Sequence, residues 1–188
     1  YEGEWKDNMR NGQGKKIYTT GAVYEGWWED GHRNGQGKMV YADGSVYVGW
    51  WEHGDRSGRG NLTHSSGWSY EGEMKDNMRN GQGKVSCEDG VYEGQWKNDL
   101  WDGQGKMIYT TGSVYEGWWE DGNRNGQGKM IYATGSVYEG WWEHGDRSGR
   151  GNLTHSSGWS YEGEWKDNMR NGQGKVSCED GVYEGQWK

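Results

Sequence analysis

One stretch decides the fold: residues 24–44 read YEGWWEDGHRNGQGKMVYADG. At its start Tyr24, Gly26 and Trp28 occupy every second position, so they share one face of an extended chain, and a period of two is typical of a β-strand. Farther along lies a Gly-x-Gly motif, and the stretch closes on the turn dipeptide Asp43-Gly44. The pattern therefore predicts a strand, a turn, a returning strand and a second turn.

The stretch is one copy of a repeat that fills the chain. A Tyr opens each repeat, at positions 1, 24, 47, 70, 92, 115, 138, 161 and 183, so the spacing is 23, 23, 23 and 22 residues, twice over. Counting that Tyr as offset 0, 33 of the 37 Gly lie at offsets 2, 11, 13 and 20, and the other four lie at offset 7. We therefore predict a single repeat array over residues 1–188.

Two blocks, residues 1–91 and 92–182, are near-duplicates of four repeats each. Natural repeats usually diverge further, so the near-identity favours a recent duplication or an engineered array. The partial ninth repeat, which starts at Tyr183, favours a piece of a longer chain.

The composition excludes a core of branched aliphatic residues. The chain has 10 Val, 3 Ile, 3 Leu, no Phe and no Pro, but 15 Trp and 13 Tyr. Each buried Trp or Tyr can remove about 150–250 Å² from water, whereas each Gly in a helix costs about 1 kcal/mol relative to Ala. We therefore predict an all-β fold, an elongated and twisted antiparallel β-meander of stacked hairpins with two strands per repeat, forming a solenoid-like array.

The first repeat shows where strands and turns are expected. Asn11-Gly12 is a strong hairpin dipeptide. The predicted parts are a strand over residues 1–6, a turn over residues 7–12, a returning strand over residues 13–19 and a turn at Thr20-Gly21.

The predicted register sets large residues against small ones, so that aromatic rings cover bare glycine backbone. In the second repeat this places Trp28 opposite Gly37. By the same pairing Met39 faces Gly26 and Tyr41 faces Tyr24.

The repeat resembles the MORN (membrane occupation and recognition nexus) motif, whose pattern is Tyr-Glu-Gly-x-Trp, then Gly-x-Gly, then a late Gly. The resemblance covers the whole chain, with eight full repeats and a partial ninth. Two departures are Met74, which replaces a Trp, and Trp101, which replaces a recurrent Arg. The resemblance implies an elongated all-β scaffold of a kind known for protein binding, for self-association through its ends and for proposed membrane contact.

We predict a non-enzymatic scaffold that binds a protein partner, either a helix or an extended segment, along an aromatic-lined face of the sheet. Aromatic side chains are favoured at interface hot spots. The candidate contact residues, called the aromatic floor, are the offset-0 Tyr and offset-4 Trp of four repeats: Tyr24, Trp28, Tyr47, Trp51, Tyr115, Trp119, Tyr138 and Trp142. No catalytic residue and no cofactor are predicted, because no P-loop or nucleophile elbow occurs and the acids at offset 1 recur in nearly every repeat.

Four further tryptophans lie at offset 3, on the opposite face: Trp27, Trp50, Trp118 and Trp141. An exposed aromatic patch with a polar rim marks a surface for a partner, a lipid headgroup or a sugar. The structural alternative is that these rings cover glycines or stack on Lys38 and Lys129. Two other functions therefore stay open: lipid or glycan binding through these tryptophans, and a self-assembling structural or engineered solenoid joined end to end through its terminal sheet edges.

The remaining candidates favour structural roles. Arg recurs at offset 9, where it could bind an anion, but its position in the predicted loop favours support of the turn or a pair with a neighbouring Glu. His53 and His64 recur as His144 and His155 without carboxylate or Cys company, so no metal site is predicted.

Charge and cysteine usage limit the partners and the compartment. A net charge of −8 and a pI near 5.2 argue against duplex nucleic acid and count against anionic lipid. Cys87 and Cys178 fill the same repeat position and indicate neither a disulfide nor a metal site. We expect a cytoplasmic protein, with the cytoskeleton or a membrane surface as its possible associations.

Overall fold

The computed structural model describes residues 1–188, and all of its regular elements are β-strands, 17 in number. Strands that follow one another in the chain pair in antiparallel hairpins, which confirms the predicted all-β meander. The residues group into two compact units, one of residues 1–88 and 96–99 and the other of residues 89–95 and 100–188.

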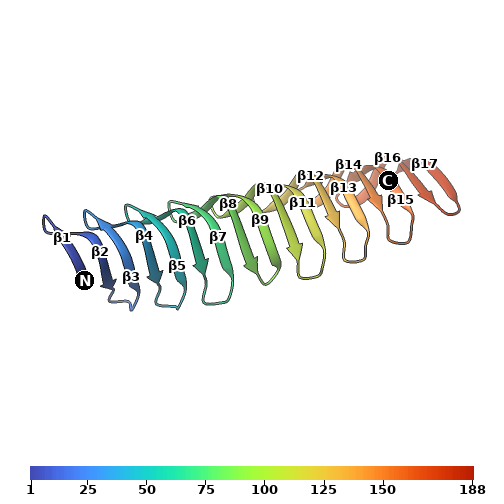
Figure 1. Cartoon of the computed structure of the whole chain (residues 1–188). Helices are drawn as coiled ribbons and strands as arrows, with labels where there is room; N and C mark the ends of the chain where they lie inside the picture. The colour runs from blue at the N-terminus through green and yellow to red at the C-terminus, as the bar shows by residue number, and fades with distance from the viewer. The chain divides into compact units, whose positions relative to one another are not determined.

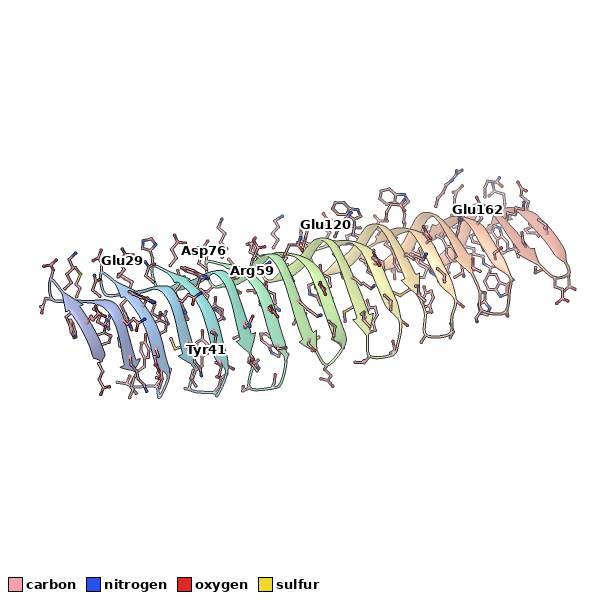
Figure 2. The ribbon with its side chains drawn as sticks, in the orientation of Figure 1. Glu29, Tyr41, Arg59, Asp76, Glu120 and Glu162 are labelled. Atoms are coloured by element: carbon pink, nitrogen blue, oxygen red, sulfur yellow. The ribbon has the colours of Figure 1, made fainter.

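The first compact unit contains eight complete strands, each paired with the next (Figure 1). Tight turns alternate with longer connections. In Figure 2, Asp76 lies in a tight turn along one edge of this sheet, and Tyr41 begins a longer connection along the other edge. The strands are β1 (Glu2–Lys6), β2 (Met9–Ile17), β3 (Val23–Glu29), β4 (His32–Val40), β5 (Val46–Glu52), β6 (Asp55–Thr63), β7 (Ser69–Lys75) and β8 (Met78–Cys87).

The second compact unit repeats this pattern. Strand β9 (Gly90–Lys97) gives its residues 90–95 to this unit, and each of the following strands pairs antiparallel with the next. These strands are β10 (Leu100–Tyr109), β11 (Val114–Glu120), β12 (Asn123–Ile131), β13 (Val137–Glu143), β14 (Asp146–Thr154), β15 (Ser160–Lys166), β16 (Met169–Cys178) and β17 (Gly181–Trp187).

Each hairpin turns at offsets 6 and 7, not at the Asn-Gly dipeptide. In the first repeat the turn is Asp7-Asn8, with φ angles of 49° and 63°. Positive φ at both central residues defines the type I′ turn that suits the twist of a hairpin. The prediction of a turn over residues 7–12 and a returning strand over 13–19 was therefore wrong, since the returning strand β2 already begins at Met9. The second predicted turn is confirmed, because the Gly21 N–H donates to the Tyr18 carbonyl at 2.9 Å.

The Asn-Gly dipeptide forms a bulge inside the returning strand. In the second repeat the register jumps between the pair Gly26–Gly37 and the pair Trp28–Arg33. Three residues of β4, Asn34 to Gln36, therefore stand opposite the single residue Trp27. Gly35 has φ +72°, the left-handed region that Gly adopts without steric cost.

The predicted register was also wrong by two residues. Gly37 pairs with Gly26 rather than with Trp28, and Met39 pairs with Tyr24. The same match of Gly with Gly recurs at every strand pair of the first unit, which produces a continuous row of paired glycines that crosses the strands. We call it the glycine row: Gly3, Gly14, Gly26, Gly37, Gly49, Gly60, Gly72 and Gly83.

Tyrosine rings close one side of the glycine row, which we call the core face. A Cβ added at Gly37 would lie 2.2 Å from the Tyr24 hydroxyl oxygen. That hydroxyl donates to the Trp27 carbonyl at 3.0 Å, which holds the ring flat along its own strand. Aromatic cover of glycine is thus confirmed, but Tyr rather than Trp supplies it.

Tryptophans at offset 4 link neighbouring repeats on the core face. Trp51 contacts Tyr47 of its own repeat and Tyr24 of the preceding one edge to face, with ring centroids 5.2 and 5.3 Å apart. Its indole N–H donates to the Gly37 carbonyl at 3.3 Å. This geometry recurs along both units, so stability comes from contacts between adjacent repeats.

Burial of the core tyrosines makes stability sensitive to high pH. Burial raises the pKa of Tyr47 to about 12, although the nearby Arg56 lowers it in part, and burial raises the pKa of Tyr24 and Tyr70 as well. The unfolded chain loses these protons near pH 10, so their stabilising effect is complete below about pH 10 and is lost as the pH rises toward the folded-state values. Urea unfolding followed by circular dichroism should show a constant midpoint up to about pH 9 and a falling midpoint from about pH 10 to 12. A midpoint unchanged at the highest pH would contradict the burial of these hydroxyls.

Candidate functional site

The offset-3 tryptophans lie on the face opposite the Tyr rings, which we call the second face. Trp27 and Trp50 expose 47% and 50% of their surface, whereas their neighbours Trp28 and Trp51 on the core face expose 4% and 3%. The structural alternative, that these rings cover glycines, is correct for the first atoms of the side chain, since a Cβ added at Gly35 would lie 3.3 Å from the Trp27 Cβ. The bulge glycine thus makes room for the tryptophan, while much of the ring stays in solvent.

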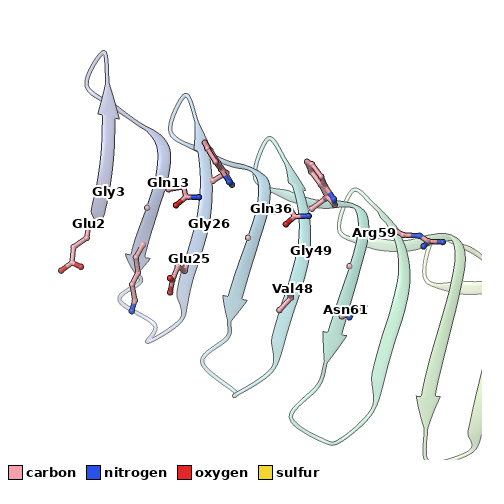
Figure 3. A pocket seen from close by; sticks show the side chains of 16 residues that line it. Glu2, Gly3, Gln13, Glu25, Gly26, Gln36, Val48, Gly49, Arg59 and Asn61 are labelled. Carbon is pink, nitrogen blue, oxygen red and sulfur yellow. The ribbon is translucent and has the colours of Figure 1, made fainter.

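A groove of about 820 Å³ runs along the second face of the first unit, across β1 to β6. Figure 3 shows that its floor is bare backbone at Gly3, Gly26 and Gly49. The glycine row therefore has two sides, one closed by Tyr rings and one open. The other side chains that line the groove are Glu2, Gln13, Lys15, Glu25, Trp27, Gln36, Val48, Trp50, Arg59 and Asn61.

Trp27 and Trp50 stand along one wall of this groove, on β3 and β5. Each pairs directly with a glutamine of the preceding strand, Trp27 with Gln13 and Trp50 with Gln36. Amide groups therefore alternate with indole rings along this wall. Such a wall can offer hydrogen bonds to polar backbone groups and apolar surface to side chains.

The second unit has a smaller and more charged counterpart, of about 530 Å³, which Trp118 lines. Two ion pairs cross it, Lys106–Glu116 at 3.8 Å and Lys129–Glu139 at 3.6 Å. In the first unit Val48 stands where the second has Glu139, and it pairs with Lys38 across the strands. The two grooves therefore differ in their charged side chains although their repeats are nearly identical in sequence.

The eight residues of the aromatic floor lie on the core face, and the structure places all of them in the core. Each tyrosine of this set is 0% exposed, and its tryptophans are at most 4% exposed. The four in the first unit, Tyr24, Trp28, Tyr47 and Trp51, lie beneath the glycine row as seen from the groove. Direct contact between these side chains and a partner stays a prediction.

The recurrent Arg supports a turn, as expected, and does so in the neighbouring repeat. Arg10 donates from Nη2 to the Gly31 carbonyl at 2.6 Å, and Arg124 donates to the Gly145 carbonyl at the same distance. A second contact was not predicted: the Arg10 guanidinium also lies 4.5 Å from the ring centroid of Trp28. The constant spacing between the Arg and the next Trp was the available signal.

Positions that depart from the repeat also contact aromatic rings. Trp101 replaces the Arg and stacks on Tyr92, with ring centroids 4.6 Å apart and an interplanar angle of 15°. His64 stacks on Trp68 at 4.9 Å, and its Nδ1 lies 2.8 Å from the Ser66 hydroxyl. His64 and its counterpart His155, which stacks on Trp159 at 4.8 Å, therefore have structural partners.

The structure contains no helix that is long and apolar enough to cross a membrane. Among solved structures, the chain is similar to the SAS-4 (dCPAP) TCP domain of Drosophila melanogaster in complex with a proline-rich motif of Ana2 (dSTIL), with 11% identity, coverage of 93% of this chain and 90% of that chain, and a TM-score of 0.49. It is also similar to the G-box domain of the microcephaly protein CPAP, with 14% identity, coverage of 94% and 100%, and a TM-score of 0.46.

A sequence comparison gives the family. No relative was found among curated proteins. The MORN repeat matches residues 1–23, 24–46, 70–91, 92–114, 115–137 and 161–182, which together are more than half of the chain. The two unmatched repeats, residues 47–69 and 138–160, form hairpins with the same glycine pairing. The chain therefore belongs to the MORN repeat family.

Proposed function

We propose that the chain is a non-enzymatic scaffold that binds an extended polypeptide segment in the second-face groove of its first unit. The observation that carries this proposal is the open side of the glycine row, flanked by two half-exposed tryptophans. The exposed aromatic pair and the bare backbone beside it form a groove that crosses β1 to β6. Partner-binding aromatic residues of this kind are frequent hot spots.

The spacing of the two tryptophans favours an extended segment over a helix. Trp27 and Trp50 lie two strands apart, on β3 and β5, and two strand spacings are about 9.6 Å. Three residues of a polyproline II segment advance about 9.3 Å. Apolar or proline side chains three residues apart would therefore meet one indole ring each.

The net charge of the whole chain, −8, favours a partner that carries positive charge beside its apolar residues. In the lining of the groove itself, Glu2 and Glu25 balance Lys15 and Arg59. An acidic scaffold attracts basic segments and repels acidic ones. This sign also counts against a surface of anionic lipid.

We propose that the first-unit residues of the aromatic floor act from beneath the groove. Tyr24 and Tyr47 fill the other side of the glycine row, so they keep the backbone of the groove flat and rigid. A rigid floor lowers the ordering cost of binding. On this account Trp28 and Trp51 affect binding through the fold, and Trp27 and Trp50 affect it by contact.

The test is the affinity of the whole chain for peptides selected from a display library of unstructured twelve-residue segments. The double variant Trp27→Ala/Trp50→Ala should bind the selected peptide at least about 30-fold more weakly, which is the loss of one hot-spot residue of about 2 kcal/mol, and about 700-fold more weakly where the two losses add. Isothermal titration calorimetry measures the loss.

Three further arms make this test specific. The matched variant Trp118→Ala/Trp141→Ala should keep the affinity, because these residues lie in the second unit. Val48→Glu copies the residue at Glu139 and should weaken binding of an apolar peptide. An unchanged affinity in the Trp27→Ala/Trp50→Ala variant would overturn the proposal. It would also be overturned if no peptide were selected while liposomes or soluble glycans, titrated separately, bound at the same groove.

A further inference from the structure

Met74 occupies a position that tryptophan fills in the duplicated block, where the equivalent residue is Trp165. Trp165 contacts Tyr138 and Tyr161 edge to face, with ring centroids 5.3 and 5.1 Å apart. Its indole N–H donates to the Gly151 carbonyl at 3.0 Å. One flexible thioether replaces all of these ring contacts at Met74, which is itself only 4% exposed.

The arginine beside this position lacks the tryptophan ring that its counterpart contacts. Arg147 lies 4.3 Å from the ring centroid of Trp165, and its Nε donates to Asn168 Oδ1 at 3.3 Å. Its counterpart Arg56 lines the same cavity as Met74 and keeps one guanidinium hydrogen bond, from Nη2 to the Asn77 carbonyl at 2.7 Å, but its Nε is a buried nitrogen with no hydrogen-bond partner. The ring contact that remains to Arg56 is with Tyr47, at 5.6 Å.

A cavity of about 430 Å³ opens beside Met74 on the core face, within the size range of small-ligand sites. Leu62, Trp68 and Met74 give it apolar walls, and Arg56 lines it as well. The other charged groups in its lining have partners of their own: Arg79 Nε lies 2.9 Å from Asp99 Oδ1, and Asp43 accepts a hydrogen bond from the Ser45 N–H at 2.9 Å. Arg56 is thus the charged group of this cavity that lacks the tryptophan ring found beside its counterpart Arg147.

We propose that this cavity binds a planar aromatic ring of about the size of indole, supplied from outside the chain and stacked on the Arg56 guanidinium. The template is the chain's own Trp165, which holds that place under the equivalent arginine. Met74 can make room, because its unbranched side chain adapts to irregular space and favours contact with aromatic rings. The ring restores the cation–π contact that six other arginines of the chain make with a tryptophan.

Two sources could supply such a ring: a free indole-type molecule, or a tryptophan side chain of a bound polypeptide. The site lies on the core face, so it is independent of the groove that Trp27 and Trp50 line on the second face. Loss of one site therefore leaves the other in place. The two proposals can fail separately.

The experiment is calorimetric titration of the whole chain with indole, and in a second arm with a short peptide that contains one Trp, against the same peptide with Ala in its place. The wild-type chain should bind one indole. Met74→Trp, which fills the cavity with the chain's own side chain, should bind at least about tenfold more weakly, which is about 1.4 kcal/mol. Trp165→Met should create a second site, so that this variant binds two.

Each of the two variants tests the proposal independently of the other. If Trp165→Met fails to fold by circular dichroism, the loss of binding in Met74→Trp still decides the question, and the reverse holds too. Tighter binding of the Trp peptide than of indole, with no binding of its Ala version, would identify a polypeptide source, and the opposite order would identify a small molecule. The proposal is overturned if the wild-type chain binds neither probe, or if Met74→Trp binds indole as tightly as the wild type does.

Discussion

Replacing Gly37 with Ala should destabilise the first compact unit by about 3 kcal/mol, which is at the upper end of the usual cost of overpacking. The added Cβ would lie 2.2 Å from the Tyr24 hydroxyl oxygen and 2.5 Å from two carbons of its ring. Tyr24 cannot move away easily, because it is 0% exposed and its hydroxyl is bonded to the Trp27 carbonyl. Urea unfolding followed by circular dichroism measures the change in the free energy of unfolding.

Gly44→Ala is the matched control for that substitution. Gly44 has φ +88°, so Ala is strained there, but no atom lies within 4 Å of the added Cβ. Its cost should be about 1–2 kcal/mol, which is the cost of the left-handed conformation alone. If Gly44→Ala destabilised the unit more than Gly37→Ala, the glycine row would not be a close contact between ring and backbone.

Trp51→Ala and Trp50→Ala should differ strongly although the two residues are neighbours in sequence. Trp51→Ala removes edge-to-face contacts with two tyrosines, the hydrogen bond to the Gly37 carbonyl and the ring beneath Arg33, which lies 4.3 Å from its centroid. Its cost should be about 3–5 kcal/mol, as for other buried aromatic truncations.

Trp50→Ala should cost about 1 kcal/mol or less, since substitutions at exposed positions are usually close to neutral. The Trp50 ring is 50% exposed, and its base packs on Gly58. Thermal and urea unfolding of the two variants give the comparison directly. Equal losses of stability would mean that both faces of the sheet belong to the core, and the groove would lose its role as a free surface.

The repeat made the fold predictable to the level of the hairpin. The constant offsets of Tyr, Trp and Gly identified strands, their alternating faces and the meander, because a side chain that recurs every 23 or 22 residues must meet the same environment each time. The period of two predicted that Trp27 and Trp28 lie on opposite faces of the sheet. Their exposed fractions, 47% and 4%, confirm this prediction.

Turn position and register could not be settled by the same reasoning. Asp7-Asn8 and Asn11-Gly12 are both good turn dipeptides, and only one of them can close the hairpin. The choice depends on the bulge at Gly12, where φ is +70°. That bulge offsets the strands by two residues, so any register counted from the Asn-Gly dipeptide was bound to place Trp opposite the glycine row.

The site was predictable only in part. The half-exposed Trp27 and Trp50 were found from their unusual offset, but the groove depends on the glycine pairing, which requires the correct register. Met74 was likewise predictable only in part, since its departure from the repeat was visible in the sequence. The cavity and the incomplete Arg56 became apparent only when the contact between Arg and the next Trp was known.

We propose that the core face holds the array together and that the second face binds a partner. The most direct test follows the indole N–H signals of the 15 tryptophans by nuclear magnetic resonance while the selected peptide is added to the whole chain. The signals of Trp27 and Trp50 should shift most, and those of Trp28 and Trp51, whose N–H groups are bonded to the carbonyls of Gly14 and Gly37, should stay nearly in place. Large shifts at Trp28 and Trp51 with none at Trp27 and Trp50 would contradict these roles of the two faces.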